Sequence, residues 1–185
     1  MIRLIVGMCG ASGAVYGVRL LELLRFIGAE THLVLTKNAE ITIQREMEVA
    51  IEHVRSIATK TYEIDDLAAP IASGSFKTDG MVIIPCSVKT LAGIANGFSE
   101  NLLLRAADVT IKEKRTLVLC PRETPLSPIH LENMLKLARI GVIILPPVPA
   151  FYTRPKNIDD IINQTLGRVL DFFKIHHHLY KEWSG

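Results

Sequence analysis

The chain has 185 residues, of which 49% are hydrophobic, and a formal net charge of +2 at pH 7. This length and composition predict one globular domain over residues 1–185. The near-neutral charge, without a basic cluster, argues against nucleic-acid binding, and the longest apolar runs are too short to span a membrane.

The first 24 residues hold a strand, a small-residue turn and a helix. Leu4–Val6 is typical of a buried strand, Gly10–Gly13 forms the turn, and apolar residues at three-residue spacing follow from Val15 to Leu24. A glycine turn before a helix N-terminus is an arrangement that holds phosphate. The spacing matches neither G-x-G-x-x-G nor GxxxxGK[ST], and it suits the single phosphate of a mononucleotide such as FMN. An ordinary strand-to-helix turn is the alternative.

The rest of the chain continues the alternation of strands and helices. Further strands are predicted at 30–35, 81–85, 116–120 and 142–145, and helices at about 38–50, 54–58, 87–96, 101–114, 127–140 and 158–173. Five strands alternating with helices predict a single doubly wound, Rossmann- or flavodoxin-like α/β domain. Its mainly parallel sheet would lie in a three-layer α/β/α arrangement.

Polar residues follow several of the predicted strands, at the edge where ligands bind in open α/β sheets. Thr36 and Ser87 are predicted helix caps at this edge. Arg122 and Glu123 stand between two prolines, and charges in so stiff a loop favour a functional role. Tyr152 follows a proline-rich segment that would hold it near the same edge.

For other charged residues, a structural role is an alternative to a functional one. Glu46 is more typical of a solvated helix carboxylate. Arg105 and Lys112 lie two helical turns apart on one helix face. They form either a solvated basic stripe or a pair that reaches one phosphate. Arg168 stands off the buried stripe of the last helix.

The cysteines and the C-terminal tail give further expectations. Cys9, Cys86 and Cys120 follow strand-like runs and predict buried thiols in a reducing cytoplasm. No signal peptide is recognisable before the first strand. The consecutive histidines at 176–178 are interpreted as a polar patch, and no metal site is expected. The tail, about 174–185, carries the only tryptophan, Trp183, and is expected to contact a neighbouring subunit.

Six motifs together resemble the UbiX family of flavin prenyltransferases, and the resemblance runs from Gly7 to Trp183. They are GASG at Gly10–Gly13, SGSF at Ser73–Phe76, PCSVKTLAGIA at Pro85–Ala95, PRETPLS at Pro121–Ser127, HLENM at His130–Met134 and PPVPAFY at Pro146–Tyr152. One departure is Cys9, where many relatives carry threonine.

The resemblance implies a metal-independent transferase that joins the dimethylallyl group of dimethylallyl monophosphate to N5 and C6 of reduced FMN. The prenylated FMN would pass to a UbiD-type decarboxylase, and members assemble as dodecamers with sites between subunits. The implied FMN-binding residues are Gly10, Ala11, Ser12, Thr36, Ser87, Val88, Lys89, Thr90 and Arg122. The implied donor-binding residues are Arg105, Lys112, Tyr152 and Arg168, and the implied catalytic residues are Ser12, Glu46, Glu123 and Trp183.

The resemblance also suggests how the catalytic residues act. Glu123 would protonate the leaving phosphate, and Trp183 would offer a π face to a developing allyl cation. Glu46 and Ser12 would manage protons at the flavin.

Two alternatives remain open from the sequence. An FMN-dependent cysteine decarboxylase of the same fold would be expected to carry a catalytic histidine and a PASANT-type motif, whereas the corresponding turn here is Pro85–Thr90, PCSVKT. A non-catalytic FMN-binding subunit of a decarboxylase would not require the set of Glu46, Glu123, Lys112 and Arg168.

Overall fold

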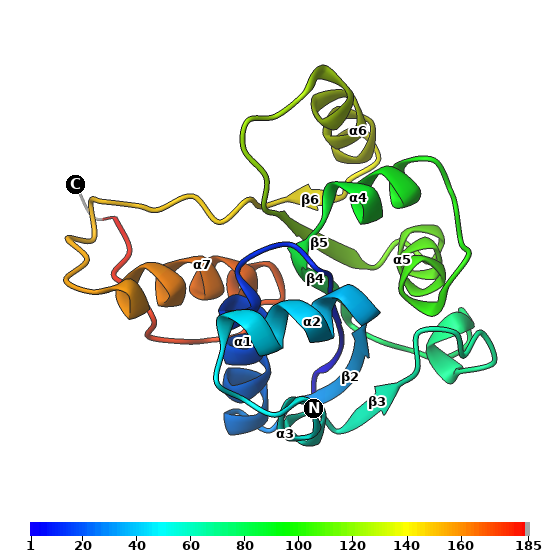
Figure 1. Ribbon diagram of the computed structural model, residues 1–185, viewed down its shortest axis with the longest axis horizontal. Helices are drawn as coiled ribbons and strands as arrows, with labels where there is room; N and C mark the ends of the chain where they lie inside the picture. The colour runs from blue at the N-terminus through cyan, green and yellow to red at the C-terminus, as the bar shows by residue number, and fades with distance from the viewer. Residues whose placement is uncertain (184–185) are drawn as a thin grey trace.

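A single twisted sheet forms the centre of the computed structural model, which describes residues 1–183 (Figure 1). All neighbouring strands are parallel, in the order β3-β2-β1-β4-β5-β6. The strands are β1 (Arg3–Met8), β2 (Glu30–Leu35), β3 (Lys60–Tyr62), β4 (Gly80–Cys86), β5 (Thr116–Pro121) and β6 (Ile143–Ile144). This confirms the predicted doubly wound α/β fold.

Helices cover both faces of the sheet, so the structure has three layers. One face packs against α1 (Ala14–Phe26), α2 (Lys37–Glu46), α3 (Ile51–Ile57) and α7 (Ile158–Phe172). The other face packs against α4 (Val88–Ala95), α5 (Leu102–Lys112) and α6 (Pro128–Arg139), with the short 3₁₀ helix η1 (Pro70–Ala72) beside α5.

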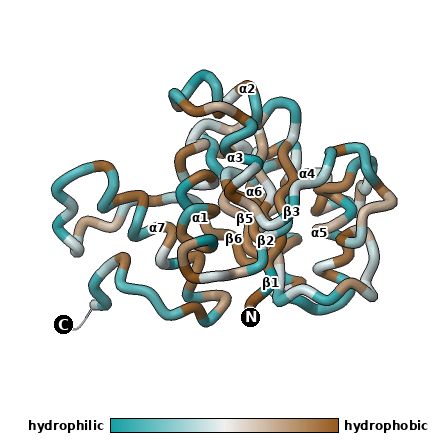
Figure 2. Tube along the Cα trace, turned by 90° about the horizontal axis from the view of Figure 1, so that it is seen from below, coloured by the Kyte–Doolittle hydropathy of each residue, from teal (hydrophilic) through white to brown (hydrophobic). Residues whose placement is uncertain are grey.

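The strands are apolar along their whole length because both of their faces are covered. In β1, Leu4 and Val6 point into one hydrophobic core while Ile5 points into the other. All seven residues of β4 are buried. The hydropathy colouring in Figure 2 shows the resulting band of hydrophobic strands inside a largely hydrophilic exterior.

The predicted caps are confirmed at the helix starts. Thr36 accepts a hydrogen bond from the Ala39 N–H at 3.1 Å, and Ser87 accepts one from the Thr90 N–H at 3.3 Å. Ser127 and Asn157 cap α6 and α7 in the same way. Each such cap stabilises its helix by about 1 kcal/mol, and the first two fix where α2 and α4 begin at the carboxyl edge of the sheet.

The segment 38–70 differs from the prediction. The helix expected over 38–50 ends at Glu46, and α3 begins at Ile51 rather than at 54. The sequence analysis missed β3, a sixth strand at the sheet edge. It has three residues, of which only Tyr62 is buried, so its sequence carries no apolar run.

The segment between β6 and α7 projects away from the sheet, and the chain after α7 turns back along that helix (Figure 1). We call residues 145–157 the arm and residues 174–183 the tail. Among the described residues, no helix has the length and apolar character needed to cross a membrane.

Candidate active site

The crevice between the carboxyl ends of β1 and β4 is the topological switch point of the sheet. The chain leaves β1 toward β2 and leaves β4 toward β5, which lie on opposite sides. Ligands bind at such crevices in open α/β sheets. The Cys9 N–H donates to the Pro85 carbonyl at 3.1 Å, and the Cys9 thiol donates to Thr90 Oγ1 at 3.2 Å. These contacts bring the Gly10–Gly13 turn next to the Ser87–Thr90 turn, as a shared ligand requires.

Cys9 is a buried member of this hydroxyl cluster. A hydrogen bond with Cys86 lowers the pKa of the Cys9 thiol to about 7, although burial opposes the shift. Thr90 Oγ1 accepts from Cys9 and also from the Ser87 hydroxyl at 3.1 Å. Thr90 Oγ1 thus accepts two hydrogen bonds and links Cys9 to Ser87.

A hollow of about 350 Å³ opens where α2 and α4 begin. Thr36, Lys37 and Asn38 line it from the start of α2, and Lys89 lines it from the start of α4. The N–H groups at the two helix starts and the ammonium groups of Lys37 and Lys89 favour an anion, whereas the carboxylates of Asp65 and Glu100 in the same lining oppose one. The helix starts are therefore the part of the hollow that fits the phosphate of FMN. Lys89 Nζ lies 3.8 Å from a carboxylate oxygen of Glu100, and such an exposed pair holds the lysine only weakly.

The N-terminus of α1 holds a carboxylate of the protein itself. The N–H groups of Gly13 and Ala14 donate to Glu46 Oε2 at 2.8 and 2.9 Å. The sequence predicts an anion at this helix start, and the anion found there is the carboxylate of Glu46. Glu46 is exposed, as expected of a solvated helix carboxylate, but it also joins the end of α2 to the start of α1. This contact forms because α2 ends beside the first turn of α1, a packing that the sequence pattern does not reveal.

The surroundings of Glu46 keep it ionised. Partial burial acts to raise the pKa of Glu46, but hydrogen bonds from Ser12 and from the N–H groups of α1 outweigh it, and the charge of Arg122 adds to them. The pKa of Glu46 lies below its usual value as a result. Ser12, Glu46 and Arg122 thus lie together at the switch point.

The loop after β5 reaches the same edge. The Arg122 N–H donates to the Cys86 carbonyl at 3.2 Å, which ties the loop to the end of β4. Glu123 is exposed, and its carboxylate accepts a hydrogen bond from the Thr124 N–H at 3.0 Å. The structure places both charged residues of the proline-flanked loop at the edge where the sequence predicted them.

The arm, α7 and the tail form a second group. The rings of Tyr152 and Trp183 meet edge to face with centroids 5.5 Å apart, and the Trp183 side chain is 71% exposed. A hydrogen bond with Tyr180 raises the pKa of Arg168, and the nearby Asp171 and Tyr152 act in the same direction. The structure therefore brings three predicted site residues, Tyr152, Arg168 and Trp183, into one region of a single chain.

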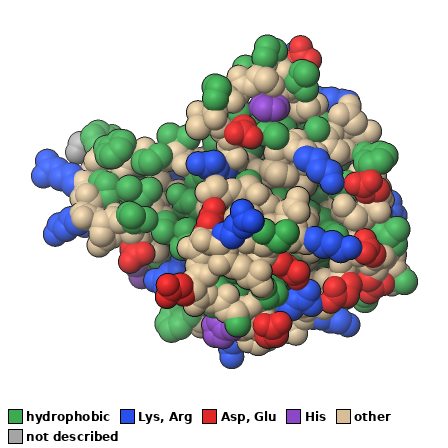
Figure 3. Space-filling model, in the orientation of Figure 1, with side chains coloured by type: hydrophobic (Ala, Val, Ile, Leu, Met, Phe, Trp, Pro, Cys, Tyr) green, Lys and Arg blue, Asp and Glu red, His purple; other side chains and the backbone are tan. Residues whose placement is uncertain are grey.

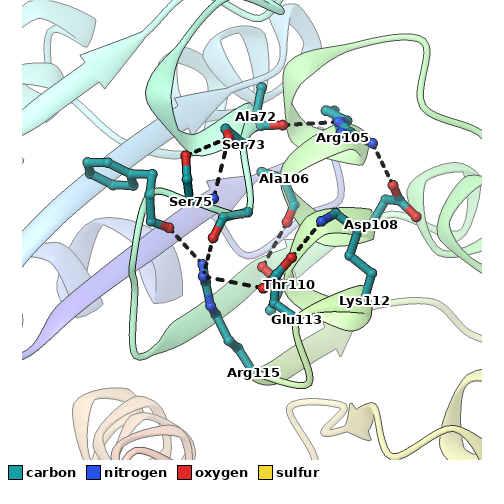
Figure 4. A network of polar contacts seen from close by, with 12 residues as sticks. Ala72, Ser73, Ser75, Arg105, Ala106, Asp108, Thr110, Lys112, Glu113 and Arg115 are labelled. Atoms are coloured by element: carbon teal, nitrogen blue, oxygen red, sulfur yellow. Dashed lines mark hydrogen bonds and ion pairs between the residues drawn. The ribbon is translucent and has the colours of Figure 1, made fainter.

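Arg105 and Lys112 belong to a different face of the molecule. Arg105 donates to the Ala72 carbonyl at 3.1 Å and to Asp108 at 2.8 Å, while Lys112 pairs with Glu113 at 2.6 Å (Figure 4). Both lie on α5, which covers the face of the sheet opposite to α7. The structure does not bring them to Tyr152 and Arg168 within one chain.

Known flavoproteins share much of this sequence. The chain matches the flavoprotein family model over residues 1–170. It is 54% identical over 188 residues to the flavin prenyltransferase UbiX of Escherichia coli K12, covering 100% of both chains. The chain belongs to the UbiX-like flavin prenyltransferase family.

Two solved structures of UbiX-like proteins have nearly the same fold. A dodecameric FMN-dependent UbiX-like decarboxylase from Escherichia coli O157:H7 is 52% identical, with a TM-score of 0.97 and 100% of each chain covered. AnUbiX (PadA1) in complex with FMN and dimethylallyl pyrophosphate is 49% identical, also with a TM-score of 0.97, covering 100% of this chain and 98% of that one.

Several residues that contact the predicted site residues and motifs were not predicted from the sequence. Asp171, His177 and Tyr180 contact one another beside Arg168, and Arg115 holds the Ser73–Phe76 loop. One signal was available: Asp171 follows Arg168 by three residues, which places the two on one helical face. The other contacts join residues that no periodicity connects.

Proposed function

We propose that this chain is a flavin prenyltransferase that transfers the dimethylallyl group of dimethylallyl monophosphate to N5 and C6 of reduced FMN and releases inorganic phosphate. The observation that carries the proposal is the gathering of the family's motif residues at one sheet edge. There, a polar crevice for the flavin lies on the side of the molecule that also presents Arg122 and Glu123.

The switch-point crevice supplies the groups that hold FMN. Its phosphate would lie against the starts of α2 and α4, and Ser12 and Arg122 lie further along the same edge. The complete set consists of Gly10, Ala11, Ser12, Thr36, Ser87, Val88, Lys89, Thr90 and Arg122. When bound in its reduced form, FMN supplies the two nucleophilic positions for prenyl transfer.

The close packing of the Gly10 turn on α2 shapes this crevice. A Cβ at Gly10 would lie 2.5 Å from the Cβ of Asn38, so a larger residue would force the turn and α2 apart.

Cations and a phenol would bind the donor phosphate. Arg168 and Tyr152 come from α7 and the arm, and the guanidinium of Arg168 is suited to a phosphate dianion. Neutralising the phosphate charge makes it a better leaving group. No step of this scheme draws on a metal ion.

The remaining site residues would move protons and stabilise charge. Glu123 would protonate the departing phosphate. Glu46, held as a carboxylate by the start of α1, would accept a proton at the flavin with Ser12 as its hydrogen-bonded neighbour. Trp183 would face a developing allyl cation with its π system.

We propose that Arg105 and Lys112 serve the site of another copy of the chain, in a homo-oligomer that is expected to be a dodecamer. They lie on the face opposite to α7 within one chain. Large exposed apolar residues gather on α6 and on the arm, where Figure 3 shows hydrophobic side chains at the surface. These are Ile129, Leu131, Leu135 and Ile140 on or next to α6, and Val148 and Phe151 on the arm. Such surfaces are typical of subunit interfaces.

The family resemblance suggests the fate of the product, and the cysteines suggest the setting. We propose that prenylated FMN passes to a UbiD-type aromatic acid decarboxylase. We also propose a cytoplasmic setting, because Cys9, Cys86 and Cys120 are all free thiols, as a reducing compartment favours.

A test separates catalysis from flavin binding. Under anaerobic conditions, we expect inorganic phosphate to be released from dimethylallyl monophosphate only when reduced FMN is also present. Glu123→Gln should lower the rate about a hundredfold, as loss of a general acid does, with FMN affinity unchanged. A wild-type protein that binds FMN but releases no phosphate would favour the non-catalytic alternative.

A further inference from the structure

The tail is fixed to α7 by contacts around one glycine. Tyr180 and His177 pack so closely over Gly167 that an added Cβ there would lie 2.5 Å from the Tyr180 ring and 2.8 Å from the His177 ring. Figure 1 shows the tail running back along α7. The tail therefore has a defined path over the second half of the helix.

A single carboxylate receives the polar groups of this contact. The Tyr180 hydroxyl donates to Asp171 Oδ2 at 2.6 Å, and His177 Nε2 lies 3.0 Å from Asp171 Oδ1. The Leu179 N–H donates to His177 Nδ1 at 3.2 Å, so Nδ1 is an acceptor and Nε2 carries the proton given to Asp171. Both oxygens of Asp171 thus hold the tail.

The same carboxylate orients Arg168. Arg168 Nη1 donates to Asp171 Oδ2 at 3.0 Å and lies 3.4 Å from the Tyr180 hydroxyl, while its guanidinium carbon lies 5.8 Å from the centre of the Phe172 ring. Within residues 1–183, the other guanidinium nitrogens have no hydrogen-bond partner. One edge of the guanidinium is fixed and the other edge is available to a phosphate.

This arrangement differs from an ordinary exposed ion pair on a helix, which contributes little. Three donors converge on Asp171. Partial burial acts to raise the pKa of Asp171, but the hydrogen bonds from Tyr180 and His177 together outweigh it, so this pKa lies below its usual value. A carboxylate with three donors stays ionised and fixed in place.

We propose that Asp171 is a positioning residue that sets both the donor-binding guanidinium of Arg168 and the course of the tail that carries Trp183. Tyr180 is three residues from Trp183, whose ring meets Tyr152. Loss of the Asp171 contacts would free the tail, move Trp183 away from Tyr152 and let Arg168 adopt other rotamers. The proposal rests on the proposed function for the role of Arg168 and Trp183.

Trp183 is the only tryptophan in the chain, so its fluorescence anisotropy reports the mobility of the tail without any turnover. We expect Asp171→Asn to lower the anisotropy of Trp183 in the intact oligomer and to raise the KM for dimethylallyl monophosphate about tenfold, the effect of one lost charge-assisted hydrogen bond. The affinity for FMN should stay within about twofold, since the crevice is made by other elements.

Two further variants separate the parts of the proposal. Tyr180→Phe removes one of the two hydrogen bonds between the tail and Asp171 and leaves the His177 contact and the Arg168–Asp171 pair. It should lower the anisotropy less than Asp171→Asn does, with less than about a threefold change in KM. Asp159→Asn makes the same charge change at an exposed position of α7 and should alter neither quantity.

The outcomes distinguish the two proposals. If the wild type shows no prenyl transfer, the proposed function fails, while the anisotropy of Asp171→Asn still tests the hold on the tail. If the wild type is active and Asp171→Asn keeps both its anisotropy and its KM, the positioning role of Asp171 is refuted. A Tm near that of the wild type excludes unfolding as the cause of either change.

Discussion

Glu46 connects two helices through one carboxylate. It stands at the end of α2, and it occupies the N-terminus of α1 by accepting the N–H groups of Gly13 and Ala14. A negative charge at this place is favoured by the helix dipole as well as by the two hydrogen bonds. The residue is therefore structural and, in the proposed mechanism, catalytic at once.

The stability of the protein should depend on Glu46 in a pH-dependent way. Because the folded state lowers the pKa of Glu46, its contribution is present above the unfolded value of about 4.3 and is lost as the pH falls through the folded pKa. Glu46→Gln should lower the free energy of unfolding by about 0.5–2 kcal/mol at neutral pH, as loss of a helix cap does. Urea unfolding at pH 7 and below about pH 4 measures the difference.

The matched control for this prediction is Glu48→Gln, which removes an exposed carboxylate two residues away, outside α2. It should leave stability unchanged at both pH values. A gap between wild type and Glu46→Gln that persists unchanged into acid would contradict the assigned role of the charge.

At the scale of elements, the Ser73–Phe76 loop is fixed by arginines rather than by regular structure. Arg115, with 15% of its side chain exposed, donates to the carbonyls of Gly74 and Phe76 at 2.7 and 2.8 Å. Gly74 fits because a Cβ there would overlap the carboxylate of Glu113. The loop is thereby held against α5, next to Lys112 and Arg105 (Figure 4).

Arg115→Ala should release this loop. Two partly buried carbonyls would lose a charged donor, which predicts a loss of roughly 1–3 kcal/mol in the free energy of unfolding. Urea unfolding measures it, with Arg19→Ala as a control because Arg19 forms only an exposed pair with Glu22. Equal effects of the two substitutions would show that Arg115 holds nothing.

Strands buried on both faces and helices that begin with a capping side chain were predicted well from the sequence. Long strands such as β4 read as apolar runs because helices cover both faces, and Ser87 or Asn157 marks a helix start by its own chemistry. The edge strand β3 could not be found, since two of its three residues face solvent or are half-buried.

The site was predictable in place but not in detail. Residues that follow parallel strands must meet at one edge, so Thr36, Ser87 and Arg122 were found by topology. The partner of Glu46 and the contacts of Asp171 depend on how α2 lies on α1 and how the tail turns back on α7. No local pattern encodes these packings.

At the scale of the whole molecule, the residues proposed to bind the donor occupy two faces. Arg168 belongs to α7 on one side of the sheet, and Lys112 belongs to α5 on the other. A shared site for both requires a second subunit, with α7 and α5 of different copies in contact.

Complementation tests this arrangement. Arg168→Ala and Lys112→Ala should each be nearly inactive alone, but coexpression should restore activity to about a quarter of the wild-type level, since random assembly gives that share of sites with both residues intact. Arg168→Ala coexpressed with Tyr152→Phe is the control and should show no rescue, because these two residues lie near each other within a single copy of the chain. A mixture of the first pair that stays inactive would contradict a site to which two copies each contribute one of these residues.

The central claim is that the chain alkylates reduced FMN. The most direct measurement is the mass of the flavin extracted after anaerobic incubation of the protein with reduced FMN and dimethylallyl monophosphate, with the diphosphate tested in parallel. We expect a flavin heavier by one five-carbon prenyl unit, formed with the monophosphate and absent when Arg168 is replaced by alanine. Recovery of only unmodified FMN, from protein that binds both compounds, would contradict it.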